Sequence, residues 1–264
     1  MVDRSNCLKV FSRYYAAWAF AQNGEVDETG RLLTDTCQLL NGAAEILKVY
    51  EGFNHLVITA LQMAIYIDSD YTFFDSAEDE VALDITKLAP ASTSLPFILL
   101  TSCNGTYFDI YFEDYIRSVQ NIGSRPVVHV HISNPTSNSE HIFKSTTYGI
   151  DADVRLTTEK APESPAYYAC RRFMIAPDLI DFYEKDALIT DIDTAFTKKI
   201  PALPATVGSH DAGLFMRQGC SPQEIFHCSL SYFRNTASTL KGLRWMRPYM
   251  LQKLTEFDSW MLDQ

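Results

Sequence analysis

The sequence predicts an α/β fold in which a mixed, mostly parallel sheet is flanked by helices and preceded by an α-helical domain. After Pro96, short apolar runs that suit buried strands alternate with helical patterns, which is typical of a parallel sheet. Before that point, apolar residues recur at helical spacing, and the segment 90–96, rich in proline and serine, separates the two regions. We therefore expect a helical domain with an acidic linker over 1–92 and an α/β domain over 93–264.

The N-terminal region is predicted to consist of short helices. Val10, Tyr14 and Trp18 share helical spacing in a first helix that ends at Asn23-Gly24. A second helix is expected from Asp27 or Thr29 to about Leu40, and further apolar spacings over 44–50 and 56–67 suggest two more elements. This region carries no catalytic motif, so we interpret it as a cap or as a docking domain for a partner protein.

The acidic stretch 68–92 is read as a solvated linker. Its aspartates and glutamates are dense, but the calcium-binding loop pattern with a central glycine is absent.

The α/β region is expected to alternate in the following order. Strands are predicted at 97–100, 127–132, 150–156 and 187–190, and helices at 107–119 and 165–183, the second with an interruption at Pro177. A basic stretch over 234–253 predicts amphipathic helices broken near Pro248. In open sheets of this class, ligands bind at the carboxyl ends of the strands.

Composition excludes several classes of function. Of the 264 residues 47% are hydrophobic, which is enough for a core and excludes disorder as the main state. The net charge of −11 argues against nucleic-acid binding but leaves room for a small phosphorylated ligand.

The location of the protein is predicted from three features. No apolar stretch approaches the roughly 18 residues of a membrane span, so none is expected. The N-terminus lacks the apolar core of a secretory signal. The six cysteines are scattered without a CxxC pair, which favours a cytoplasmic protein with buried thiols.

The strongest chemical signal is Asp191-Ile192-Asp193, directly after the predicted strand 187–190. In an extended chain, residues i and i+2 point to the same side, so the two carboxylates would face one point. A divalent cation relieves their repulsion and can bridge a diphosphate. Two solvated carboxylates in a turn are the alternative, and the same spacing recurs at Asp68/Asp70 and Asp151/Asp153.

Two weaker signals accompany it. The polar segment 101–107 contains a glycine and opens a helix, so it can offer backbone donors to an anion or a base, and Tyr107 can stack on a base. Arg171-Arg172 can meet phosphate oxygens, although an ordinary exposed pair is the favoured interpretation.

In their order along the chain, four segments resemble the nucleotide-sugar glycosyltransferases with the Rossmann-like A-type (GT-A) fold. They are FILLTSCNGTYFDIYFEDYIRSV (97–119), RPVVHVHISNP (125–135), YYACRRFMIAPDLIDFYEKDALITDIDTAF (167–196) and SLSYFRNTASTLKGLRWMRPYMLQKLTEFDSWMLDQ (229–264). The resemblance implies a sugar transferred from a UDP- or GDP-type donor to a hydroxyl acceptor.

The resemblance also implies roles for individual residues. Asp191 and Asp193, the DxD motif, would hold Mn²⁺ or Mg²⁺ on the donor diphosphate, with Asp191 also near the ribose. The nucleoside would be contacted by Thr101, Asn104 and Tyr107. Arg172 would approach the diphosphate or the sugar. Asp263 and Gln264 would lie near the donor sugar and the acceptor. An inverting reaction needs a base, for which Asp263 and Asp211 are both candidates.

Other interpretations remain open. The late metal-ligating histidine of some branches of this fold has no match in the printed sequence, and His129 and His131 are expected to be core or surface residues. Asp191 and Asp193 also resemble the nucleophile and acid/base of haloacid-dehalogenase-type phosphatases, although Ala195 stands where that family places Thr or Val. A non-catalytic nucleotide-binding or docking module is the third alternative.

Overall fold

The computed structural model describes residues 12, 13, 16, 28, 31, 32, 35, 36, 83–86, 88, 95–123, 125–200, 203–216 and 226–256. The chain divides into two compact units, one formed by residues 1–73 with 218–225 and one by residues 74–217 with 226–264. The predicted boundary at residue 92 falls in a stretch of which only 83–86 and 88 are described.

The described residues of the first unit are helical, in agreement with the first two predicted helices. Arg31 forms ion pairs with Glu28 and Asp35, three and four residues away, as helix neighbours do. Leu32 and Thr36 are buried on a neighbouring side of the helix, and the Thr36 hydroxyl donates to the Leu32 carbonyl at 2.6 Å. The other residues predicted in helices of this region, and most of the acidic linker, lie outside the described residues.

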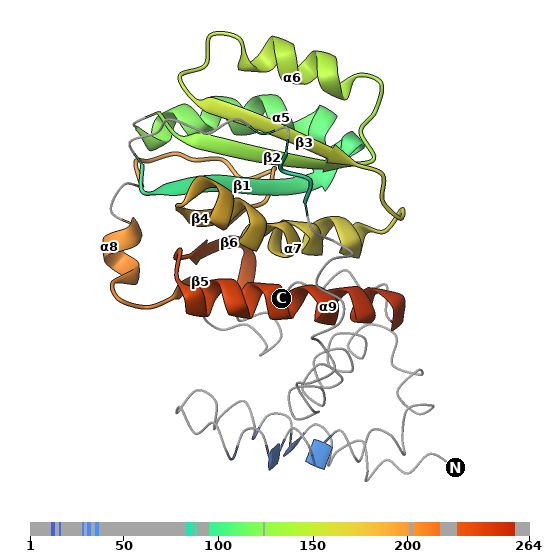
Figure 1. Ribbon diagram of the computed structural model, residues 1–264, viewed down its shortest axis with the longest axis vertical. Helices are drawn as coiled ribbons and strands as arrows, with labels where there is room; N and C mark the ends of the chain where they lie inside the picture. The colour runs from blue at the N-terminus through green and yellow to red at the C-terminus, as the bar shows by residue number, and fades with distance from the viewer. Residues whose placement is uncertain are drawn as a thin grey trace. The chain divides into compact units, whose positions relative to one another are not determined.

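The second unit is a six-stranded sheet with the order β3-β2-β1-β4-β6-β5 (Figure 1). Four neighbouring strands run parallel, while β6 is antiparallel to both β4 and β5. The strands are β1 (Phe97–Asn104), β2 (Val127–Ser133), β3 (Asp153–Glu159), β4 (Asp186–Thr190), β5 (Ala212–Met216) and β6 (Phe226–Phe233). The prediction of a mixed, mostly parallel sheet flanked by helices is confirmed.

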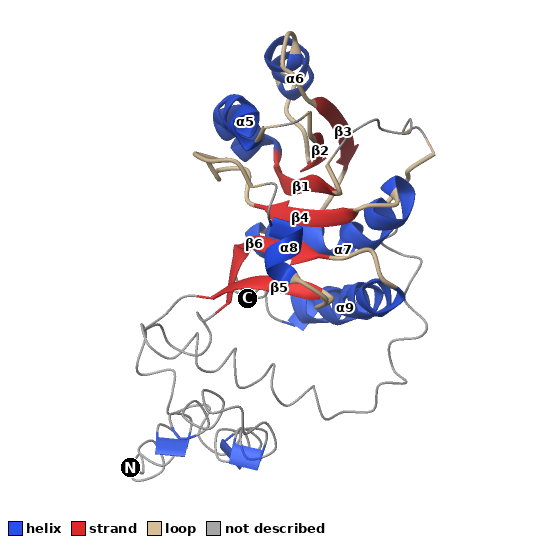
Figure 2. Ribbon diagram, turned by 90° about the vertical axis from the view of Figure 1, so that its left-hand side faces the viewer, coloured by secondary structure: helices blue, strands red, loops and turns tan. Residues whose placement is uncertain are grey.

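Helices cover both faces of this sheet (Figure 2). They are α5 (Gly105–Val119), α6 (Ser139–Thr147), α7 (Pro165–Tyr183), α8 (Leu203–Val207) and α9 (Ala237–Glu256), with a short 3-10 helix over Gln120–Ile122. Helix α5 lies in the crossover from β1 to β2, and α7 lies in the crossover from β3 back to β4. Because these two crossovers run in opposite directions across the sheet, the helices pack on opposite faces. Helix α9 packs beside α7, and α6 packs beside α5.

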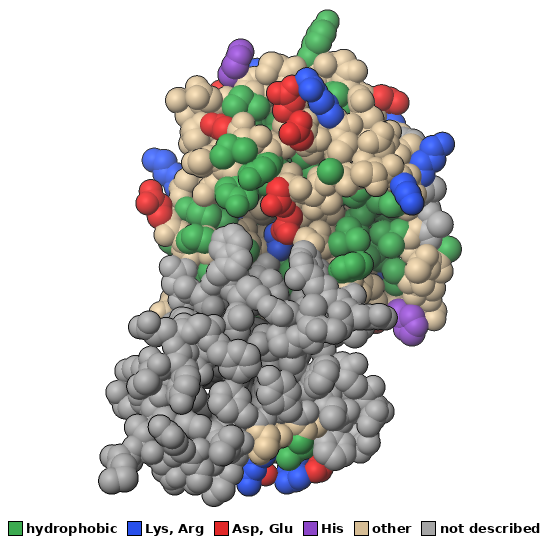
Figure 3. All heavy atoms as spheres, turned by 180° about the vertical axis from the view of Figure 1, so that it is seen from behind, with side chains coloured by type: hydrophobic (Ala, Val, Ile, Leu, Met, Phe, Trp, Pro, Cys, Tyr) green, Lys and Arg blue, Asp and Glu red, His purple; other side chains and the backbone are tan. Residues whose placement is uncertain are grey.

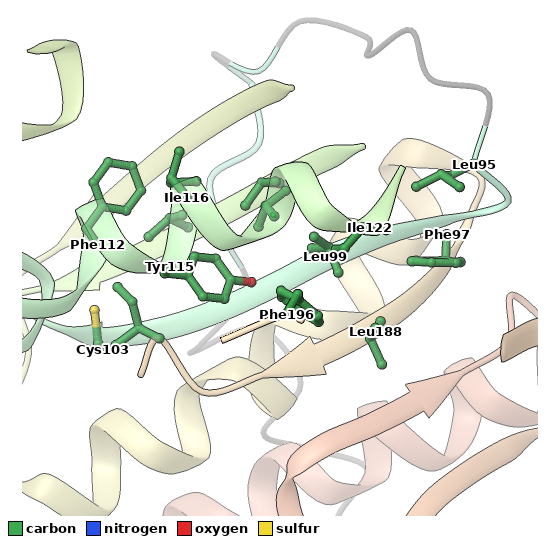
Figure 4. Close-up of a cluster of buried hydrophobic side chains, with 14 of the residues drawn as sticks. Leu95, Phe97, Leu99, Cys103, Phe112, Tyr115, Ile116, Ile122, Leu188 and Phe196 are labelled. Carbon is green, nitrogen blue, oxygen red and sulfur yellow. The ribbon is translucent and has the colours of Figure 1, made fainter. Parts of the chain in front are cut away.

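The main core lies between α5 and the sheet (Figure 4). Phe97, Leu99 and Cys103 alternate along β1 and point toward α5, where Phe112 and Tyr115 meet them. These side chains are at most 5% exposed. The rings of Phe108 and Phe112 stack with their centroids 4.3 Å apart, so aromatic packing fixes α5 on this face.

Several predicted boundaries differ from the observed ones. Strand β1 continues through Thr101–Asn104, beyond its predicted end at residue 100, because these polar residues still pair with β2. Strand β3 is displaced from 150–156 to 153–159.

Neither proline inside a helix breaks it. Helix α7 runs through Pro177 and α9 runs through Pro248, so the predicted interruptions are wrong. Among the surrounding groups, the buried Arg247 of α9 donates to the Met174 carbonyl, close to the position at which Pro177 interrupts the helical hydrogen bonds.

One face of the described part carries mixed charge. On the face opposite to the view of Figure 1, acidic and basic side chains lie interspersed, and no continuous basic surface is seen over the described residues (Figure 3). Within the same residues, no helix combines the length and apolar character needed to cross a bilayer.

The order of the strands creates a switch point between β1 and β4. From β1, the chain moves outward through β2 to β3 and then crosses back to β4 on the other side of β1. The carboxyl ends of β1 and β4 therefore open into the crevice where sheets of this class bind ligands.

Candidate functional site

A pocket of about 330 Å³ lies at the switch point, at the carboxyl ends of β1 and β4. Its walls come from β1, the start of α5, the first turns of α7, the turn after β4, and β6. The lining residues are Ser102, Cys103, Asn104, Tyr107, Pro165, Tyr168, Ala169, Arg172, Asp191, Ile192, Asp193, Cys228 and Ser229. Five of the predicted site residues thus meet in one cavity: Asn104, Tyr107, Arg172, Asp191 and Asp193.

Asp191 and Asp193 reach the pocket through a turn rather than through an extended chain. The Thr194 backbone amide donates to the Asp191 carbonyl at 3.2 Å and closes this turn directly after β4. Ile192, between the two carboxylates, is 3% exposed and joins the core on the α5 side. Both aspartates line the pocket, but they reach it through this turn, so the alternation argument does not apply to them.

Arg172 enters the pocket from α7 and forms an ion pair with the Asp191 carboxylate. The Arg172 side chain is 6% exposed, whereas that of Asp191 is 31% exposed. A guanidinium this deeply buried requires a compensating charge, which Asp191 supplies. The expectation of an ordinary exposed Arg171-Arg172 pair is wrong, because both side chains are buried.

The end of β1 and the start of α5 supply a polar wall. Asn104 caps α5, since its side-chain oxygen accepts from the Tyr107 backbone amide at 2.7 Å. The Tyr107 side chain is 42% exposed at the pocket, and its ring centroid lies 5.1 Å from that of Tyr111. An exposed ring beside a polar cap suits the stacking of a flat ligand.

Ser102 is a pocket residue that the sequence analysis did not assign. It is 4% exposed, it lines the pocket, and its hydroxyl has no hydrogen-bond partner among the described residues. Buried hydroxyls are normally paired, so this one is available to a ligand. Thr101, which was predicted to contact the nucleoside, instead points to the α5 side with Leu99 and Cys103 and is fully buried.

The first turns of α7 form the opposite wall. Pro165, Tyr168, Ala169 and Arg172 follow the spacing i, i+3, i+4 and i+7, so they lie on one stripe of the helix. Ser164 caps this helix by accepting from the Tyr167 backbone amide at 3.1 Å. The N-termini of α5 and α7 therefore both lie at the pocket, where their positive dipole ends favour an anion.

The donor set suits a divalent cation that shares its shell with a ligand. Among the described residues, no group of three or more His, Cys, Asp or Glu side chains could enclose a metal by itself. Mg²⁺ and similar hard cations are commonly held by one or two carboxylates together with substrate phosphates. Asp191 and Asp193 provide those two carboxylates on one side of the pocket.

The thiol in the pocket floor is not poised for chemistry. Burial, followed by the nearby Asp109, raises the pKa of Cys103 far above its usual range, so the thiol stays protonated and acts as an apolar wall.

Asp211 lies at the other edge of the sheet. Ala212 pairs with Phe233, which in turn pairs with Ala187 at the beginning of β4. Asp191 follows the end of β4, so the length of that strand separates the two carboxylates. Asp211 is exposed and accepts from the Thr236 hydroxyl at 2.7 Å. The structure therefore does not bring Asp211 to the pocket. Asp263 and Gln264 lie outside the described residues.

The predicted core histidines are buried in the sheet, away from the pocket. His129 and His131 are both fully buried on β2, and a ring nitrogen of each lies 2.9 Å from the Thr157 hydroxyl.

Comparison with known proteins gives similarity to solved structures but not to known sequences. No protein-family model matches the chain, and no curated protein matches it in sequence. The structure is similar to that of the galactosyltransferase LgtC in complex with donor and acceptor sugar analogues, at 14% sequence identity and a TM-score of 0.41. The match covers 61% of this chain and 63% of that one, so the chain spans less than two thirds of that protein's length. The mixed, mostly parallel sheet agrees with the GT-A fold that the sequence resemblance implies.

Proposed function

We propose that the protein is a metal-dependent glycosyltransferase, which moves a sugar from a nucleoside diphosphate donor to a hydroxyl acceptor. The observation that carries this proposal is the pocket at the β1–β4 switch point. It unites a polar helix cap and an exposed tyrosine with a buried arginine and two aspartates (Asn104, Tyr107, Arg172, Asp191 and Asp193).

The distribution of charge in the pocket supports a ligand that carries phosphate. Arg172 and the N-termini of α5 and α7 favour an anion, whereas Asp191 and Asp193 repel one. A diphosphate that arrives with a divalent cation satisfies both requirements, because the cation contacts the carboxylates and the phosphates together. A neutral ligand would make no use of the charges of Arg172, Asp191 and Asp193.

The nucleoside is assigned to the wall formed by β1 and α5. The Tyr107 ring is exposed and can stack on a base, while Ser102 and Asn104 can form hydrogen bonds with the polar edges of the nucleoside. The adjacent apolar wall of Cys103 and Ile192 suits the less polar parts of the same ligand.

In the transfer step, the bond between the sugar's anomeric carbon and the diphosphate oxygen breaks, and a bond to the acceptor oxygen forms. The electron pair of the broken bond stays on the diphosphate, where Arg172 can stabilise the added charge. Mn²⁺ or Mg²⁺, held by Asp191 and Asp193, supplies further stabilisation of that leaving group when bound. The acceptor loses its hydroxyl proton, and in an inverting reaction a carboxylate accepts that proton. We propose Asp263 as this base and place Gln264 near the sugar.

A product assay tests this function. The full chain is incubated with UDP- and GDP-sugars and Mn²⁺, with water as the default acceptor, and the products are identified by mass spectrometry. We expect slow release of a nucleoside diphosphate and free sugar, which is lost in Asp193→Ala and on removal of Mn²⁺ by a chelator.

The alternatives give different products. Release of inorganic phosphate from simple phosphate esters, with intact nucleotide-sugars, would favour the phosphatase with Asp191 as nucleophile. Binding of a nucleotide without any turnover, over long incubation and with a range of acceptors, would favour the non-catalytic module.

A further inference from the structure

The Glu159 carboxylate, at the end of β3, gathers donors from two neighbouring elements. Its Oε1 accepts from the Ser133 hydroxyl at 2.9 Å and from the Tyr167 hydroxyl at 3.2 Å. Arg171 binds it at two points, with Nε 2.9 Å from Oε1 and its terminal nitrogen 2.7 Å from Oε2. His131 Nε2 lies 3.1 Å from the same Oε1. Such a two-point contact fixes orientation as well as distance.

Glu159 is charged in this setting. Burial alone would raise its pKa, but His131 and Arg171 outweigh that effect and lower the pKa of Glu159 to about 2. The carboxylate therefore holds Arg171 as an ion pair at any pH near neutrality. The Arg171 side chain is 4% exposed and that of Glu159 is 20% exposed, so solvent screens this pair weakly.

Two successive arginines of α7 thus bind carboxylates on different strands. Arg171 binds Glu159 on β3, and Arg172 binds Asp191 after β4. In the sheet order, β2 and β1 separate these strands. Since consecutive helical residues point about 100° apart, two such pairs fix the rotation of α7 about its own axis.

We propose that Glu159 is a positioning residue, which holds α7 through Arg171 so that Arg172 meets Asp191 and the diphosphate; this rests on the proposed function of the pocket. The helix carries two neighbouring stripes. Tyr167 and Arg171 bind Glu159, whereas the stripe from Pro165 to Arg172 faces the pocket. Loss of the contacts that Tyr167 and Arg171 make with Glu159 allows the helix to rotate about its axis. Arg172 is then no longer directed at Asp191.

A matched control lies at the other end of the same helix. Asp178 of α7 forms an ion pair with Arg247 of α9, in which the arginine is also 4% exposed and the carboxylate 16% exposed. Asp178 does not line the pocket. Asp178→Asn and Glu159→Gln therefore each remove a similarly buried carboxylate charge that pairs with an arginine, but only Glu159→Gln changes the contacts of Tyr167 and Arg171 in α7.

The first test needs no ligand. Thermal unfolding of the full chain is measured for Glu159→Gln, Asp191→Asn and the double variant. We expect the double variant to lose less in Tm than the two single losses together, because Glu159 supports the pair that Asp191 forms. Asp178→Asn combined with Asp191→Asn should be additive. Additivity in both combinations would overturn the proposal.

The second test measures the affinity for UDP and for GDP with Mn²⁺. Glu159→Gln should weaken binding roughly tenfold, as loss of a supporting contact typically does, while Asp178→Asn binds like the parent. Equal affinity of Glu159→Gln and the parent would contradict the positioning role. If the parent binds neither nucleotide, the proposed function fails, and the ligand-free test alone decides the role of Glu159. Should Glu159→Gln not fold, Arg171→Lys replaces it in both tests, because it keeps the charge and loses the two-point contact.

Discussion

Ser102 and Asn104 are two polar residues on the same side of β1 that reach the pocket. Both line the cavity, while Thr101 between Leu100 and Ser102 points to the α5 side. The unpartnered Ser102 hydroxyl and the capping Asn104 side chain are thus adjacent on the same side of β1, close to Tyr107. These three residues form the polar wall assigned to the nucleoside.

His129 makes the fold sensitive to acid. It is fully buried between the Tyr183 and Thr157 hydroxyls, and burial, with smaller contributions from His131 and Arg155, lowers its pKa from 6.5 to about 3. Below pH 6.5, His129 therefore binds a proton in the unfolded chain but stays neutral in the folded chain until the pH approaches 3. Its contribution to stability is complete above pH 6.5 and is lost as the pH falls toward 3.

We expect His129→Gln to flatten this pH dependence. Between pH 6 and pH 4, the free energy of unfolding of the parent should fall more steeply than that of the variant, by about 1.4 kcal/mol per pH unit. Urea denaturation at several pH values measures both slopes. His141→Gln, which changes an exposed histidine, is the control and should keep the parent's slope. Identical slopes for His129→Gln and the parent would show that His129 is not held neutral.

Among the elements, the turn from β1 into α5 depends on a close approach between two backbone segments. A Cβ atom at Gly105 would lie 2.5 Å from the Asn134 carbonyl oxygen and 2.6 Å from the Thr136 backbone nitrogen. Both neighbours are backbone atoms at the exit of β2, so they cannot move aside as a side chain can. The absence of a side chain at Gly105 thus lets α5 begin directly beside the pocket.

Gly105→Ala should destabilise the protein by about 1–3 kcal/mol, because the inserted methyl group forces the two segments apart. Chemical denaturation measures the loss. Gly242→Ala is the matched control, since a Cβ at this exposed site in α9 meets no atom within 4 Å, and it should stabilise by about 0.5–1 kcal/mol. A neutral Gly105→Ala would contradict the close approach.

Helix α7 is the element that joins the fold to the pocket. Ser164 caps its start, and Arg171 and Arg172, about two turns further on, pair with Glu159 and Asp191. The far end of the helix is held by the Asp178–Arg247 pair. This arrangement explains why Pro177 does not interrupt it. Contacts to β3, to the turn after β4 and to α9 hold both halves of the helix in place.

At the scale of the whole sheet, the sequence predicted most of the α/β order correctly. The apolar runs at 97–100, 127–132 and 187–190 each became the body of a strand, because fully buried strands are almost continuously apolar. The end of β1 was missed because Thr101–Asn104 are polar, and only their pairing with β2 identifies them as strand.

The site was predictable in part for the same reason. Asn104 ends one buried strand, and Asp191 and Asp193 follow another. Parallel strands bring their carboxyl ends to one edge of the sheet. Asp211 was misplaced because the antiparallel direction of β6 against β4 and β5 leaves no mark in a single sequence. The burial of Arg171 also depends on a distant carboxylate, Glu159, that no local pattern reveals.

The most direct test of the account is a calorimetric titration of the full chain with UDP and with GDP, each in the presence and absence of Mn²⁺, together with Asp193→Asn. We predict saturable binding of one nucleotide that requires Mn²⁺ and is lost in Asp193→Asn, because the carboxylates at the end of β4 tolerate a diphosphate only with a cation between them. Binding of neither nucleotide to the folded parent, or binding unaffected by Mn²⁺ and by Asp193→Asn, would contradict the assignment of this pocket.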